Sequence, residues 1–126
     1  MARPKSSRLT DAELRLMDVV WERGKATVQE VVDALPRSLG LHYSTVLTTL
    51  RILEAKGYLR HSKEGRAFIY EAAVPREEAS RDAVRHVLSR FFGNRRDLLL
   101  LNLLKDEEIS PAELEQLKKM IEESKS

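Results

Sequence analysis

No cysteine occurs in the 126 residues of this chain, which excludes disulfides, thiolate metal sites and a cysteine nucleophile. The five glycines are scattered, so the chain has no glycine-rich loop for phosphate. No apolar run approaches the roughly 18 residues that span a bilayer. The basic residues at the start of the chain are not followed by the apolar stretch of a signal peptide. We therefore expect a cytoplasmic protein without membrane insertion.

Catalytic and metal-binding arrangements of residues are missing as well. His42, His61 and His86 stand apart, without the spacing of metal ligands. The paired acids at 107–108 and 122–123 are adjacent in sequence and do not form a catalytic pair on a concave scaffold. We expect no enzymatic activity, no cofactor and no bound metal.

The chain is rich in charge but nearly neutral. Hydrophobic residues make up 42% and charged residues 33%, which is typical of a globular protein, and the formal net charge is +2. Cations slightly exceed acids over residues 1–75, which is a weak indication of a polyanionic partner. Residues 1–8 are predicted to form a flexible basic arm, whose Arg3, Lys5 and Arg8 either contact phosphates or stay disordered.

Residues 9–74 show the pattern of three helices followed by a β-hairpin. The hairpin is predicted over residues 58–72, where segments rich in strand formers flank a turn at Glu64-Gly65. Helices and hairpin in this order predict a winged helix-turn-helix. The helices are predicted from the capping box at residues 10–13 to Gly24, from the cap Thr27 to Pro36, and from Tyr43 or Ser44 to Lys56.

The third predicted helix has one apolar face and one small, polar face. Val46, Leu50 and Leu53 fall on the side expected to meet the core. The opposite face is short, carries hydroxyls and one cation, and has no acid before Glu54, as a helix in a major groove requires. Helix-cap duty is the alternative for Ser44. The expected DNA-binding residues of this helix are Tyr43, Ser44, Thr45, Thr48 and Arg51.

The predicted hairpin tip offers a second contact with DNA. Arg66, and after it Lys63, are expected to reach the sugar-phosphate backbone or the minor groove. A solvated, charged turn without any partner is the alternative.

Residues 75–126 are predicted to be helical, over about 76–92, 95–105 and from a capping box at 110–113 onward. The run 98–104 is apolar nearly all the way round its helix, so it needs cover on several sides. A second copy of the chain would supply that cover; a self-contained three-helix arrangement is the alternative. The residues expected at the dimer interface are Val84, Leu88, Phe91, Leu98, Leu100, Leu101, Leu104, Leu114, Leu117 and Ile121.

Taken in order, several short motifs resemble the penicillinase-repressor (BlaI/MecI) family of bacterial winged-helix regulators. The motifs cover nearly the whole chain from residue 9, and their order and spacing make the resemblance specific. They lie at residues 9–13 and 20–21, 43–50, 56–59, 65–70, 101–104, 109–110 and 113–114.

The resemblance implies a homodimer that binds a palindromic operator and represses transcription, often of β-lactam resistance genes. It also implies a membrane sensor-protease that cuts the repressor after an asparagine, at the position of Asn102. Family members have phenylalanine after the cut, whereas this chain has Leu103. A polar point on an apolar helix is the other interpretation of Asn102. Copper-responsive relatives carry C-terminal cysteines, which this chain lacks.

The sequence thus predicts a mainly α-helical fold with a small β-hairpin. A winged helix-turn-helix over 9–74 is followed by a helical dimerisation region over 75–126. The predicted function is a DNA-binding repressor, and a winged-helix module that binds proteins instead of DNA is the alternative.

Overall fold

The computed structural model describes residues 9–106 and 109–125, so the predicted basic arm over 1–8 lies outside the described residues. The chain divides into two compact units, with the boundary between Ala83 and Val84. None of the helices in the described ranges has the length and apolarity needed to cross a membrane. The elements are α1 (Asp11–Arg23), β1 (Lys25–Thr27), α2 (Val28–Ala34), a 3-10 turn (Arg37–Leu39), α3 (Tyr43–Ala55), β2 (Leu59–Glu64), β3 (Ala67–Ala72), α4 (Arg76–Phe92), α5 (Arg96–Asp106) and α6 (Pro111–Lys125).

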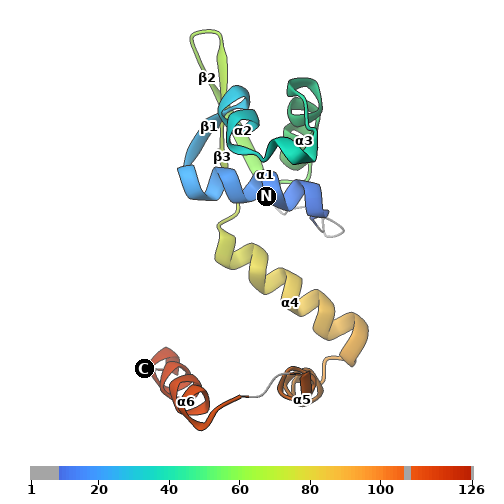
Figure 1. Ribbon diagram of the computed structural model, residues 1–126, viewed down its shortest axis with the longest axis vertical. Helices are drawn as coiled ribbons and strands as arrows, with labels where there is room; N and C mark the ends of the chain where they lie inside the picture. The colour runs from blue at the N-terminus through green and yellow to red at the C-terminus, as the bar shows by residue number, and fades with distance from the viewer. Residues whose placement is uncertain (1–8, 107–108, 126) are drawn as a thin grey trace. The chain divides into compact units, whose positions relative to one another are not determined.

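The first unit is a winged helix, with three helices packed on a small antiparallel sheet (Figure 1). The strands follow the order β1-β3-β2, and the β2–β3 hairpin projects as the wing. The expected fold class is confirmed, but β1 was missed. It has only three residues, and its partner β3 lies more than 40 positions further along the chain, so no local pattern marks it.

The wing turns one residue later than the sequence indicated. Glu64 pairs with Ala67 as the last rung of the hairpin, so the turn consists of Gly65 and Arg66 rather than Glu64-Gly65. Gly65 has a φ of +60°, which glycine adopts without strain at the first central position of a type II′ turn. Arg66 therefore lies at the tip of the wing, as expected, and is one of the two turn residues.

The core is formed by one cluster of apolar side chains in the first unit. Val46, Leu50 and Leu53 of α3 are fully buried in it, as the helical pattern predicted. Trp21 is half-buried against the same cluster, and its Nε1 donates to the Val74 carbonyl at 2.9 Å. Because α3 is fixed along its whole apolar side, its opposite face is presented to solvent in a defined orientation.

A half-buried ion pair joins the first helix to the end of α3. The Thr10 amide donates to Glu13 at 2.8 Å and the Thr10 hydroxyl accepts from the Glu13 amide at 3.1 Å, which confirms the predicted capping box. Lys56 Nζ donates to both Glu13 carboxylate oxygens at 2.8 and 2.9 Å. Burial raises the pKa of Glu13, but the hydrogen bonds from Lys56 and Thr10 outweigh it, so this pKa lies below its usual value.

Removing this charge should destabilise the winged helix. In Glu13→Gln the capping geometry can persist but the bond to Lys56 loses its charge, so we expect a loss of about 2 kcal/mol in the free energy of unfolding at neutral pH. The folded-state pKa is the lower one, so this contribution is full above the unfolded pKa and is lost as pH falls through the folded value. Urea titrations from about pH 7 to pH 3 should show that the free energy of unfolding falls more steeply with pH in the wild type than in Glu13→Gln. Parallel curves of this free energy against pH would contradict the stabilising role of the Glu13 charge.

Candidate nucleic-acid interface

The N-terminus of α3 begins without a side-chain cap. The cap position is held by His42, whose side chain makes no capping hydrogen bond, and Ser44 already lies inside the helix. Cap duty for Ser44 is therefore wrong. The amides of the first turn of α3 have no partner within the helix, and such amides with the helix dipole favour an anion such as a phosphate.

The solvent face of α3 is as small and polar as the sequence indicated. The Thr48 hydroxyl donates to the Ser44 carbonyl at 2.9 Å, and the Thr49 hydroxyl donates to the Thr45 carbonyl at 2.8 Å. With its hydrogen committed to the helix, Thr48 offers outward an acceptor oxygen and a methyl group, which suit base amino groups and the thymine methyl. The residues exposed on or beside this face are Tyr43, Ser44, Thr45, Thr48, Arg51, Ile52 and Ala55.

The charge of Arg51 affects a buried tyrosine, which the sequence did not reveal. This charge acts on the hydroxyl of Tyr70, a residue of β3 that is only 2% exposed. Burial raises the pKa of Tyr70, the charge of Glu54 raises it further, and Arg51 opposes both. The Tyr70 side chain therefore stays a neutral phenol.

The wing is tied to α3 by His61, which the sequence suggested was isolated. His61 Nδ1 lies 2.7 Å from both carboxylate oxygens of Glu54, and since a carboxylate only accepts, Nδ1 carries the proton. The His61 ring stands edge-on to Phe68, with centroids 5.3 Å apart, and tilts against Tyr70 at 5.8 Å. The pairing needs α3 and β2 to meet at a set angle, so residue spacing alone could not predict it.

The cations of the wing divide into paired and unpaired ones. Arg60 forms an ion pair with Glu71 across the strands, with Nε and Oε1 3.0 Å apart. Lys63 lies over the Phe68 ring, 5.7 Å from its centroid. Within residues 9–106 and 109–125, no ion pair engages Arg51, Lys63 or Arg66, so their charges are available to an external anion.

The side chains expected at a dimer interface are largely exposed in the single chain. Phe91 is 70% exposed and Leu100 is 60% exposed, while Leu88 is half-buried. Among the described side chains of α5 and α6, none is buried. Asn102 and Leu103 are both exposed and lie within α5. One copy of the chain thus leaves the run 98–104 without the cover that its composition requires.

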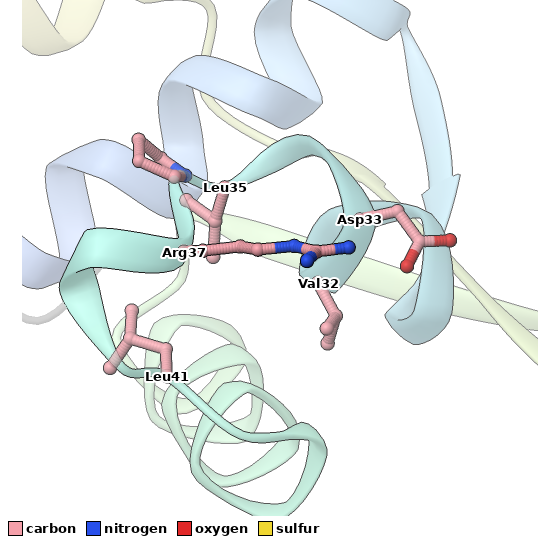
Figure 2. A pocket seen from close by; sticks show the side chains of 6 residues that line it. Val32, Asp33, Leu35, Arg37 and Leu41 are labelled. Carbon is pink, nitrogen blue, oxygen red and sulfur yellow. The ribbon is translucent and has the colours of Figure 1, made fainter.

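A cavity of about 360 Å³ lies between α2 and the segment that leads to α3. Figure 2 shows the Arg37 side chain stretched along it toward Val32 and Asp33, with Leu35 and Leu41 on its walls. The cavity lacks the several converging polar groups of an enzyme site. In the part of the chain that the structure describes, no cluster of His, Asp or Glu has the arrangement needed for a metal ion.

Known proteins resemble this chain in sequence and in structure. A sequence model of the family described as Penicillinase repressor matches residues 9–123. The penicillinase repressor of Bacillus licheniformis is 30% identical over 122 residues, which cover 97% of this chain and 95% of the relative. The solution structure of the DNA-binding domain of the repressor BlaI superposes with a TM-score of 0.51 at 34% identity, over 56% of this chain and 87% of that one. Monomeric Bacillus licheniformis BlaI in complex with the blaP half-operator gives a TM-score of 0.50 at 33% identity, over 57% of this chain and 88% of that one.

Proposed function

The chain belongs to the penicillinase repressor family, a class of transcriptional regulators rather than enzymes, and we propose that it represses transcription by binding a palindromic operator as a homodimer. The observation that carries the proposal is the solvent face of α3, which joins exposed hydroxyls to the unpaired cation Arg51. The alternative of a winged-helix module that binds only proteins is not favoured, because a relative with this fold is known in complex with a half-operator.

We assign α3 to the major groove and the wing to the flanking backbone. Ser44, Thr45 and Thr48 lie in the N-terminal half of α3, the part of a recognition helix that meets base edges. Arg51 follows one turn later with five donors, which match the O6 and N7 acceptors of guanine. Tyr43, at the first position of the helix, would bond a phosphate.

The homodimer is proposed from the apolar side chains of α4, α5 and α6. Large exposed apolar patches mark interaction surfaces in soluble proteins. In a dimer related by a two-fold axis, the run 98–104 of each copy would cover that of the other. Two recognition helices would then add their binding energies on two half-sites.

A membrane sensor-protease that acts at Asn102-Leu103 is the proposed route of induction. Both side chains are exposed in α5, the helix on which the proposed dimer depends. A cut there would separate α6 from the rest of the chain and split the leucine run. Since proteases bind extended backbone, α5 would have to open locally before cleavage.

The proposal is tested by titrating the folded chain into labelled DNA from upstream of its own gene. We expect saturable binding that falls with salt, with a slope of log K against log [salt] of about −0.9 for each phosphate neutralised. A competitor of random sequence should release the DNA only at much higher concentration. No binding at the lowest salt, by a chain that circular dichroism shows to be folded, would refute the proposal.

Arg66 at the wing tip should act on affinity and not on sequence preference. Arg66→Ala is expected to reduce the steepness of the salt slope by about 0.9 for each wing, because one phosphate per wing is no longer neutralised. Operator and random DNA should weaken by the same factor, since phosphate contacts carry no sequence information. A changed preference between the two DNAs with an unchanged slope would show that Arg66 reads bases.

A further inference from the structure

Two opposite charges lie one turn apart on α3, yet they are not paired with each other. Arg51 and Glu54 have the i, i+3 spacing at which an arginine and a carboxylate meet on a helix surface. Such a pair would neutralise the cation assigned to DNA and place an anion beside the phosphates. Within the described residues, the Glu54 carboxylate hydrogen-bonds His61 and forms no ion pair with Arg51.

The geometry around Glu54 directs its carboxylate to the wing. Both of its oxygens lie 2.7 Å from His61 Nδ1, and the His61 ring is held between Phe68 and Tyr70. Among the residues that the structure describes, Arg51 forms no ion pair with Glu54. A residue of the sheet therefore holds the Glu54 carboxylate, and the position of that residue is fixed because His61 on β2 faces Tyr70 on β3.

We propose that His61 is a positioning residue that captures Glu54 on the wing and so keeps Arg51 free to read DNA. The inference rests on the proposed function. Its physical basis is competition between His61 and Arg51 for the Glu54 carboxylate. A carboxylate that accepts a hydrogen bond from His61 is oriented toward the wing and is not available to Arg51. Without His61, Glu54 would be free to pair with Arg51, which lies three residues before it on the same helix.

A simple mechanical role for the pair gives the opposite prediction for one variant. If the hydrogen bond between His61 and Glu54 served only to fasten the wing to α3, then loss of either partner would weaken DNA binding. If His61 restrains a harmful carboxylate, loss of His61 weakens binding, whereas loss of the carboxylate does no harm. The two roles therefore differ in the sign of the effect of Glu54→Gln.

The experiment measures operator and random-DNA affinities for the full chain, His61→Phe, Glu54→Gln and the double variant. His61→Phe keeps a ring between Phe68 and Tyr70 but removes the donor to Glu54. We expect it to reduce operator affinity roughly tenfold relative to random DNA, near the lower end of the value of one bidentate base contact. Glu54→Gln should bind the operator at least as tightly as the wild type. The double variant should recover to within about twofold of Glu54→Gln, a non-additive result that marks direct coupling.

Glu64→Gln in the His61→Phe background is the matched control. It also removes a carboxylate from the winged helix, but Glu64 lies at the end of β2 and not on α3. It should give no recovery of the operator preference, which separates release of Arg51 from a general gain in positive charge. Equal harm from Glu54→Gln and His61→Phe, or a double variant that stays weak, would overturn the inference while wild-type binding stands. A wild type that binds no DNA would overturn the proposed function and this inference with it.

Discussion

Replacing Leu100 by glutamate should convert the chain to a monomer and abolish tight operator binding. Leu100 is 60% exposed in the single chain and lies in the middle of the run 98–104. Burying one leucine contributes about 1.5–3 kcal/mol. A two-fold interface loses two of them, so the dimer dissociation constant should rise by a factor of roughly 10² to 10⁴. Sedimentation velocity over a range of protein concentrations would measure the change.

Leu100→Met is the matched control for that variant. Methionine keeps the volume and apolar character of leucine, so the dimer should persist with little change in its dissociation constant. Both variants should keep the melting behaviour of the winged helix, because residue 100 lies outside the first compact unit. A Leu100→Glu chain that still sediments as a dimer would remove the leucine run from the interface.

Arg51→Ala should abolish most of the preference for operator over random DNA. One bidentate contact between arginine and guanine contributes about 1–3 kcal/mol of discrimination. A dimer loses one contact in each half-site, so the ratio of operator to random affinity should fall roughly 30-fold or more. Competition titrations with both DNAs in the same buffer would measure the ratio.

Arg51→Lys separates the charge of this side chain from its shape. Lysine keeps the positive charge but lacks the planar fork, so random-DNA affinity should be retained while part of the operator preference is lost. If Arg51→Ala weakened operator and random DNA equally, Arg51 would be a phosphate contact and the assignment of base reading would be wrong.

Local signals in the sequence predicted most of the fold. The capping box at Thr10 and the apolar spacing of Val46, Leu50 and Leu53 are short-range patterns, and the structure confirms both. The predicted bounds of the helices agree closely with the observed ones, since caps, glycines and Pro36 mark them. The exposure of the α3 face followed directly, because a helix buried on one side presents the other.

Features that depend on distant segments were not predictable. β1 forms only because it pairs with β3, which lies far along the chain. The hairpin turn lies one residue later than predicted, because Glu64 pairs with Ala67. Similarly, the contact between His61 and Glu54 could not be predicted from the sequence, because the two residues lie on different elements. The partner of Glu54 is set by how β2 docks on α3, and the angle between these elements is a tertiary property.

A footprint of the chain on the DNA upstream of its own gene tests the central claim most directly. Two copies with one recognition helix each should protect two segments of inverted sequence, with centres about 10 base pairs or a multiple of that apart. Methylation of guanine N7 should be blocked within each segment, because α3 is assigned to the major groove. A single protected segment without two-fold repetition, or protection confined to the minor groove, would contradict the account.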